Sequence, residues 1–247
     1  MALSALALLA AALLTPPLAA EEAATLDDLL QAVLALEAEI PPSARTAGVL
    51  GTQRRGSGVV IDDHGLVLTI GYLILEAKRV TLTTQDGRRI PAVVVGYDTY
   101  SGFGVVRALR PIPALPVRFG RSADLARQDP VLVIDGRRED RINSAIVVSS
   151  RTYAGYWEYL LEGAIFTSPP VENFSGAALF DKDLQLVGIG SLVVRNASEE
   201  LNLPGNMFVP IDEARPVLDD LIAFGRPSAP PKPWLGVNLA ELYDHLV

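Results

Sequence analysis

Few side chains in this chain of 247 residues could carry out nucleophilic or metal chemistry. The chain has no cysteine and only two histidines, His64 and His245, which lie far apart in the sequence. The absence of cysteine excludes thiolate chemistry, a disulfide and a zinc–cysteine site, and two distant histidines exclude a histidine-rich metal site. We therefore expect neither a metal nor a cofactor. Serine chemistry remains, but a serine that attacks an amide needs a base, a carboxylate that orients the base, and donors for the oxyanion.

Three segments, in a fixed order, resemble motifs of one known family. Gly56-Ser57-Gly58-Val59-Val60-Ile61 precedes Gly65-Leu66-Val67-Leu68-Thr69-Ile70-Gly71-Tyr72, Asp86-Gly87 leads to Gly96-Tyr97-Asp98, and Ser175-Gly176-Ala177 leads to Leu186-Val187-Gly188-Ile189. They resemble the G-S-G, D-G-x-x-x-x-A-x-V-x-G-x-D and S-G-G-x-L-x-(N/D)…L-V-G-I motifs of HtrA/DegP-like, trypsin-fold serine proteases. The order and spacing make the resemblance fairly specific, and it spans about residues 54–225. It implies an all-β fold of two antiparallel six-stranded β-barrels, with the site between them.

The resemblance also shows that this chain departs from the family at the catalytic positions. Ser175 falls at the position of the nucleophile, whereas Tyr72 stands at the histidine position and Gly102 at the aspartate position. The G-N-S-G-G oxyanion loop of the family becomes Asn173-Phe174-Ser175-Gly176-Ala177, so Asn173 replaces a glycine whose backbone N–H points at the oxyanion. Asparagine tolerates positive φ better than most residues, and we therefore leave open that the oxyanion hole can form.

No side chain in the sequence is an evident substitute for the missing base. A tyrosine with a pKa near 10 is ionised in roughly one molecule per thousand at neutral pH, and Lys78, Lys182 and Lys232 lie in a helix end, a turn and the linker. Glu172 remains an alternative base for Ser175. Loss of the base from a serine protease costs about a million-fold in turnover, roughly 8 kcal/mol. We therefore predict that the protein is a pseudoprotease, without physiological proteolysis.

Composition limits the classes of ligand that the protein can bind, and the N-terminus indicates the compartment in which it acts. The net charge is −8 and there is no basic run, which argues against nucleic-acid binding, because that requires concentrated Lys and Arg. Residues 1–20 comprise an apolar Ala/Leu core followed by small residues, and they predict a signal peptide for export to the periplasm or cell envelope. The apolar run is too short for a comfortable membrane span. The alternative is an uncleaved N-terminal anchor.

Periodicity and turn signals predict the remaining organisation. Thr25 to Ile40 has an apolar stripe at helical spacing, so residues 21–42 are predicted to form an N-terminal helix. A first barrel is predicted over 43–112 and a second over 113–225, the latter closed by a helix from Asp212 to Phe224 that Gly225 terminates. Residues 226–247 are predicted to be a Pro-rich linker and a stub, Trp234-Leu235-Gly236-Val237, that resembles the start of a PDZ domain. The predicted strands are 55–61, 66–70, 79–84, 89–97 and 103–108, then 130–135, 142–149, 155–167, 177–180, 185–193 and 206–210.

These observations predict an exported, inactive serine protease homologue that acts in quality control by binding polypeptide. One alternative is an active serine endopeptidase in which Ser175 uses a base other than histidine. Another is a structural subunit whose 25–40 helix assembles with itself or with an active homologous protease. No interaction with a membrane is predicted beyond export.

Overall fold

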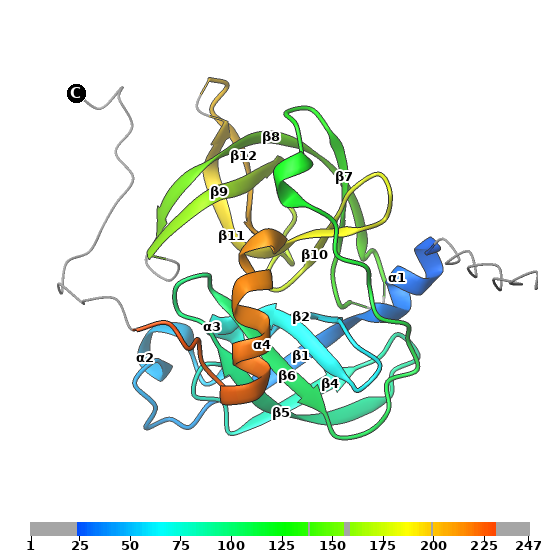
Figure 1. The fold of residues 1–247 in the computed structure, drawn as a ribbon, viewed down its shortest axis with the longest axis vertical. Coiled ribbons are helices and arrows are strands. Elements are labelled where there is room, and N and C mark those ends of the chain that lie inside the picture. The colour runs from blue at the N-terminus through cyan, green and yellow to red at the C-terminus, as the bar shows by residue number, and fades with distance from the viewer. Residues whose placement is uncertain (1–23, 138, 156–158, 199, 231–247) are drawn as a thin grey trace, which may run out of the picture.

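Two closed antiparallel barrels, each of six strands, make up the described part of the chain (Figure 1). The computed structural model describes residues 24–137, 139–155, 159–198 and 200–230. The first barrel has the strand order β1-β2-β3-β6-β5-β4 and the second β10-β11-β12-β9-β8-β7. Pairing of β1 with β4 closes the first barrel, and pairing of β10 with β7 closes the second. The predicted all-β double barrel is therefore confirmed.

The strands of the first barrel are β1 (Val33–Glu39), β2 (Gln53–Val60), β3 (Leu66–Ile70), β4 (Arg79–Thr83), β5 (Arg89–Tyr97) and β6 (Phe103–Ala108). Those of the second are β7 (Pro130–Ile134), β8 (Ile142–Gly155), β9 (Tyr159–Ser168), β10 (Ala178–Phe180), β11 (Leu186–Ser198) and β12 (Leu203–Pro210). The helices are α1 (Leu26–Ala32), α2 (Ala47–Leu50), α3 (Gly71–Ile74) and α4 (Arg215–Phe224), with 3₁₀ turns η1 (Ser122–Asp124) and η2 (Ile211–Glu213).

The predicted N-terminal helix over 21–42 is wrong beyond Ala32. Thr25 caps α1 in a capping box with Asp28, as the sequence suggested, but the helix ends after seven residues and β1 follows. Leu34, Leu36 and Ala38 are buried in alternation with partly exposed residues, so the apolar pattern has a period of two as well as the helical period. Pairing with β2 and β4 selects the strand, because without β1 the first barrel has only five strands and stays open.

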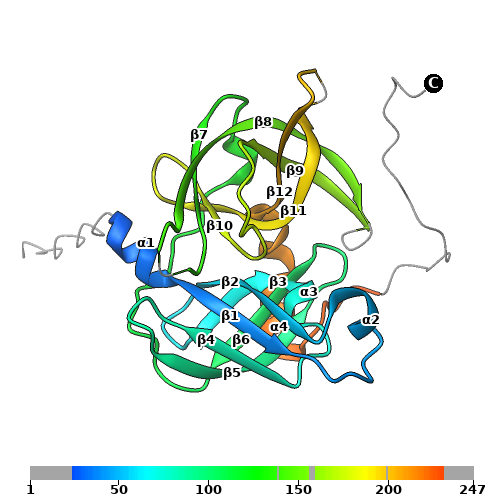
Figure 2. The ribbon, with the colours of Figure 1, turned by 180° about the vertical axis from the view of Figure 1, so that it is seen from behind.

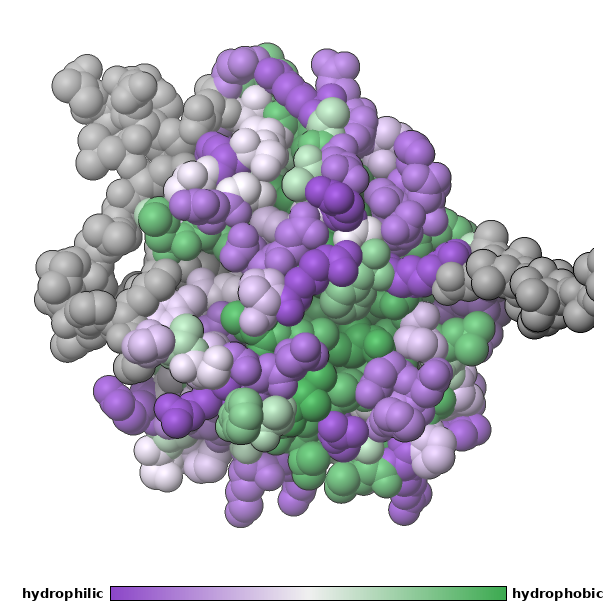
Figure 3. Space-filling model, viewed as in Figure 1, coloured by the Kyte–Doolittle hydropathy of each residue, from purple (hydrophilic) through white to green (hydrophobic). Residues whose placement is uncertain are grey.

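Helix α4 runs from the second barrel across the first and joins them (Figures 1 and 2). Its C-terminal Gly225 has φ +72° and donates its N–H to Leu221, so the predicted glycine stop is confirmed. A Cβ added at Gly96 in β5 would lie 2.5 Å from the Gly225 carbonyl, which shows how closely the helix end approaches that strand. On this face of the molecule, apolar residues gather in the middle, beside α4, and polar residues surround them (Figure 3).

The predicted signal peptide at 1–20 and the PDZ-like stub beginning at Trp234 lie outside the described residues, as do residues 231–233 of the predicted linker. Within the described residues, no helix is long and apolar enough to cross a membrane.

Ser57 of β2 joins the two barrels by two hydrogen bonds. Its N–H donates to the carbonyl of Ser175 at 2.9 Å, and its Oγ accepts the N–H of Gly136 at 2.8 Å. Its carbonyl accepts the hydroxyl of Thr69 at 2.7 Å, within the first barrel. Gly176, with φ +72°, permits this approach, because a Cβ there would lie 2.2 Å from the Ser57 carbonyl. The backbone around Ser175 is thus fixed against the first barrel.

We predict that Gly176→Ala lowers the free energy of unfolding by more than about 2 kcal/mol, because it combines a left-handed backbone with a clash against backbone. Two control variants separate these causes. Gly163 has φ +64° and a Cβ there would meet only the Ser150 hydroxyl, at 4.0 Å, so Gly163→Ala tests the backbone cost of roughly 1 kcal/mol. Gly48 has nothing within 4 Å, so Gly48→Ala should be neutral or slightly stabilising. Urea unfolding measures all three, and equal losses in Gly176→Ala and Gly163→Ala would contradict the clash.

Candidate functional site

The structure brings Tyr72 and Ser175 together where the two barrels meet. Tyr72 belongs to α3, between β3 and β4 of the first barrel, and Ser175 lies in the loop that precedes β10 of the second. The Oη atom of Tyr72 lies 2.9 Å from Oγ of Ser175 and 2.8 Å from the backbone carbonyl of Ser191 in β11. Ser175 and Tyr72 are both partly buried. The aligned nucleophile and the residue at the histidine position are therefore in direct contact.

The positions of the hydroxyl protons follow from these two distances. A phenol has one proton to donate, and the Ser191 carbonyl can only accept. Tyr72 therefore donates to Ser191, and its oxygen remains as an acceptor for the Ser175 hydroxyl. A neutral phenol oxygen is a far weaker base than an imidazole nitrogen.

A buried arginine fixes the backbone of α3. Arg54 is only 4% exposed, and its Nη1 donates to the carbonyls of Tyr72 at 2.6 Å and Leu75 at 3.0 Å. Its Nη2 donates to the hydroxyl of Thr46 at 2.7 Å, and this hydroxyl in turn donates to Glu76 at 2.6 Å. Burial lowers the pKa of Arg54, while hydrogen bonds from Thr46 lower the pKa of Glu76. The network holds Tyr72 in place by its main chain and leaves its hydroxyl for the second barrel.

Gly102, at the position of the family's aspartate, brings no side chain to Tyr72. Its carbonyl accepts the N–H of Gly71 at 2.6 Å, and its φ is +83°. Gly102 and Tyr72 line a small cavity of about 40 Å³ together with residues 97–99. The nearby carboxylate of Asp98 accepts the N–H and hydroxyl of Ser101 at 3.0 and 2.7 Å, so it stabilises its own loop. Position 102 therefore supplies no carboxylate to Tyr72.

The oxyanion-loop residues Asn173 and Phe174 precede Ser175 in a tight turn. The carbonyl of Phe174 accepts the N–H of Ala177 at 2.9 Å. Asn173 does not have positive φ, so the tolerance of asparagine for that region is not used. In the described part of the chain, the N–H groups of Asn173 and Ser175 have no protein acceptor.

The side chain of Asn173 contacts an arginine from the β7–β8 turn. With its amide oxygen facing the guanidinium, Asn173 accepts from Nη1 of Arg137 at 2.9 Å and from Nε at 3.0 Å. Arg137 also forms an ion pair of 2.9 Å with the fully buried side chain of Asp135, which raises the pKa of the arginine. The adjacent Gly136 donates to the Ser57 hydroxyl. The β7–β8 turn therefore supports the oxyanion loop and the barrel contact at once.

The other candidate bases lie elsewhere or make no contact with Ser175. His64 is exposed in the β2–β3 turn, where its N–H donates to Asp62. Lys182 pairs with Asp183 in an exposed turn. Glu172 is exposed, and no hydrogen bond joins it to Ser175 in the described residues. Lys232 and His245 lie outside the described residues. Among the residues that the structure describes, Tyr72 is thus the side chain in hydrogen-bonding contact with the Ser175 hydroxyl.

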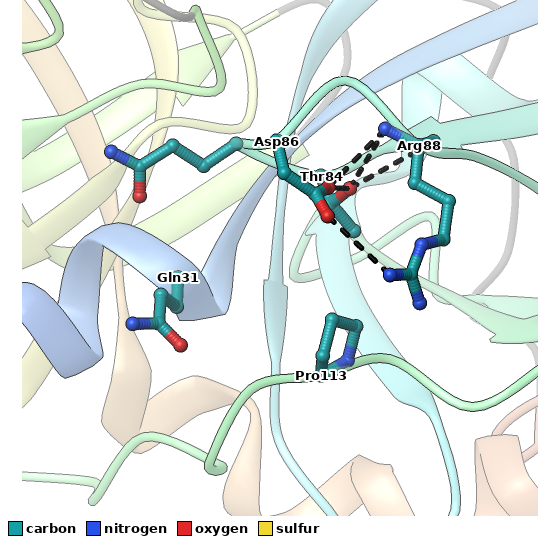
Figure 4. Close-up of a pocket in the computed structure, with 6 residues that line it drawn as sticks. Gln31, Thr84, Asp86, Arg88 and Pro113 are labelled. Atoms are coloured by element: carbon teal, nitrogen blue, oxygen red, sulfur yellow. Dashed lines mark hydrogen bonds and ion pairs between the residues drawn. The ribbon is translucent and has the colours of Figure 1, made fainter.

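A larger cavity, of about 360 Å³, lies between α1, the β4–β5 turn and the segment that follows β6, and it shares no residue with the site above (Figure 4). Its wall includes Thr84, Asp86 and Arg88. Hydrogen bonds join these three residues to one another, and Arg88 forms an ion pair of 3.5 Å with Asp86. The Thr84 hydroxyl on its wall donates to Asp86 and to the backbone carbonyl of Arg88. In the described residues, no group of three or more His, Asp or Glu side chains could hold a metal ion.

Comparisons with known proteins agree with this geometry. The family model described as "Trypsin-like peptidase domain" matches residues 56–189, which include both Tyr72 and Ser175. The chain belongs to the trypsin-like peptidase family. Serine protease PepD of Mycobacterium tuberculosis is 30% identical over 72% of this chain and 44% of its own length. A probable periplasmic serine endoprotease of the DegP-like group from Pseudomonas fulva is 26% identical over 85% of this chain and 44% of its own.

Solved structures with the same fold are HtrA-type proteases. The HtrA-type protease AlgW with a tripeptide superposes with a TM-score of 0.65, at 22% identity over 81% of this chain and 62% of that one. AlgW with a decapeptide gives a TM-score of 0.64 over 89% of this chain. This trypsin-like peptidase homologue spans less than half the length of the two curated relatives named above. The resemblance to HtrA/DegP proteases that the sequence suggested is therefore confirmed.

Three residues that matter at the site were not found from the sequence of this peptidase homologue. Ser191 acts through its backbone carbonyl, which no residue type reveals. Arg54 and Arg55 are adjacent and look alike, yet Arg54 is buried and the Arg55 side chain is 80% exposed. Arg137 lies in a charged turn that reads as an exposed loop. For Ser191, the one signal available in the sequence was that this polar residue directly follows the apolar run 186–190.

Replacement of the buried arginine tests how Tyr72 is held. We predict that Arg54→Met costs about 2–4 kcal/mol of unfolding free energy, because it leaves the carbonyls of Tyr72 and Leu75 without their donor. The matched variant Arg55→Met removes an exposed charge that pairs with Glu37 at 3.4 Å, and it should cost less than about 1 kcal/mol. Urea unfolding of the two variants gives the comparison. Equal losses would show that the network around Arg54 does not stabilise α3.

Proposed function

We propose that this protein binds extended polypeptide in the cleft between the barrels and does not hydrolyse it. The observation that carries the proposal is the Tyr72 hydroxyl, which lies 2.9 Å from the Ser175 hydroxyl while it donates to Ser191. Ser175 therefore faces a phenol oxygen whose own proton is donated to the Ser191 carbonyl, and not an imidazole nitrogen. A serine nucleophile needs a base that can take its proton and later return it to the leaving amine.

The expected rates support the absence of proteolysis. Loss of the base costs about a million-fold, and an oxyanion hole with substrate binding retains only about a thousand-fold over water. Gly102 supplies no carboxylate, so a base at position 72 would also lack its orienting partner. The two departures act on the same proton transfer. Together they support a role in binding.

The geometry of β11 supports a polypeptide as the ligand. Strand β10 pairs with β11 only as far as Ile189, whereas β12 continues along the opposite edge through Val194. Beyond Ile189, the described residues place no strand on the β10 side of β11, next to Ser175. An extended chain can add to such an edge by main-chain hydrogen bonds. Two of the solved HtrA-type neighbours contain a tripeptide or a decapeptide.

The place of action that we propose is the periplasm or another compartment of the cell envelope, in quality control of polypeptides. The predicted signal at 1–20 and the DegP-like relatives described as periplasmic support this proposal. A structural subunit that assembles through a long N-terminal helix is not supported, because α1 has only seven residues and β1 belongs to the barrel.

An active serine hydrolase remains the second candidate, and one observation favours it. In the described residues, the N–H groups of Asn173 and Ser175 are without acceptors, as an oxyanion hole requires. Such a hole stabilises a tetrahedral intermediate only if Ser175 attacks. Labelling by a fluorophosphonate probe, compared with Ser175→Ala, decides between the two candidates.

We predict that the purified protein does not cleave casein above the background of its Ser175→Ala variant. Release of soluble fragments over many hours at neutral pH measures this, with an active trypsin-like protease as the positive control. The reason is the missing base, which reduces turnover by about a million-fold. Cleavage that disappears in Ser175→Ala would refute the proposed function and establish the hydrolase.

The double variant Tyr72→His with Gly102→Asp should recover weak hydrolysis of an activated ester, and neither single variant should. A histidine without its carboxylate loses about 10,000-fold because its tautomer and orientation are not fixed. Recovery should remain partial, because position 102 has φ +83°, where an aspartate is strained by roughly 1 kcal/mol. Equal activity in Tyr72→His alone and in the double variant would contradict the role assigned to position 102.

A further inference from the structure

The carbonyl of Ser191 lies at an irregularity of β11. The register of β11 with β12 shifts between Gly190 and Leu192, at Ser191. On the other edge, Gly190 exchanges hydrogen bonds with the loop of Ser175, because it donates to Ala177 and accepts from Gly176, each at 2.8 Å. The Ser191 carbonyl thus comes directly after the last backbone pair on the edge next to Ser175, where Tyr72 occupies it at 2.8 Å.

An extended polypeptide added to this edge would meet the same carbonyl. On one edge of a strand the backbone groups of every second residue point outward. The Leu192 carbonyl accepts from Asn206 of β12 at 3.4 Å, so a ligand paired with Val193 on the opposite edge would next meet the carbonyl of Ser191. The next N–H of the ligand would then face an acceptor that is already occupied. It must displace the Tyr72 hydroxyl or remain unpaired in a partly buried place, and an unpaired donor is costly.

We infer that the hydroxyl of Tyr72 is an autoinhibitory latch on the polypeptide site, which limits how far an extended ligand can pair along β11. This inference rests on the proposed function. Tyr72 packs against the hydrophobic core, and Arg54 fixes its backbone, so the side chain is anchored while its hydroxyl reaches a strand of the second barrel. A tyrosine in place of the family's histidine then has two effects. The site loses its base, and the tyrosine hydroxyl occupies the Ser191 carbonyl, which would otherwise accept an N–H of the ligand.

The variant Tyr72→Phe tests the latch, since it removes the hydroxyl and keeps the packed ring. Binding of fluorescein-labelled β-casein, an unfolded polypeptide, is measured by fluorescence anisotropy. We expect Tyr72→Phe to bind about threefold to tenfold more tightly than the wild type, the range that corresponds to one net hydrogen bond. Tyr97→Phe is the matched control, because the described residues show no hydrogen bond from the Tyr97 hydroxyl. Tyr97→Phe should stay within about twofold of the wild type. Ser175→Ala removes the other partner of Tyr72 and leaves the Ser191 carbonyl occupied, so it should not produce the tightening expected of Tyr72→Phe.

Each result has a separate meaning. Equal affinities of wild type and Tyr72→Phe would overturn the latch and leave the proposed function standing. A lack of binding by both proteins, with thermal unfolding showing that both are folded, would overturn the proposed function and the latch with it. Tightening by Ser175→Ala as large as that by Tyr72→Phe would also overturn the latch as stated, because the occupied group would then be the Ser175 hydroxyl and not the Ser191 carbonyl.

Discussion

The contact between Ser57 and the backbone of Ser175 is the constraint on which the rest of the site depends. One serine in β2 joins the two barrels through its N–H and its hydroxyl, and its carbonyl is held from within its own barrel. Close approach requires Gly176, since any side chain there meets the Ser57 carbonyl. Because the loop of Ser175 is fixed in this way, a side chain from α3 of the first barrel can reach a strand of the second.

Replacement of an imidazole by a phenol preserves a hydrogen bond and changes its direction. An imidazole would accept the proton of Ser175, whereas Tyr72 gives its own proton to the Ser191 carbonyl and only then offers its oxygen to the serine. The site thus retains polar contacts between the barrels without a group that moves protons. Arg54 beneath α3 and Arg137 beside Asn173 maintain this arrangement from either side. A rigid, hydrogen-bonded cleft without proton transfer is suited to binding.

Much of the fold was predictable from sequence because short strands, turn glycines and motif order agreed with one another, as at the Asp86-Gly87 hairpin and the Gly225 helix stop. The contact between Tyr72 and Ser175 followed from motif alignment, although the catalytic roles of the aligned positions remain predictions. The strand at 33–39 was missed because its apolar residues fit both periods and only the barrel's need for a sixth strand decides. The Ser191 carbonyl was missed because a backbone group leaves no trace in residue type.

The position of β1 determines where this chain can be shortened. A fragment that begins at residue 43, the boundary which the sequence suggested for the first barrel, would lack the strand that pairs with both β2 and β4. Two neighbouring strand edges would then be exposed at once, and unpaired edges template association between chains. Such a fragment would be expected to aggregate, and it could borrow β1 from another molecule by strand exchange. Proteolytic trimming of the N-terminus is tolerable only if it stops before Val33.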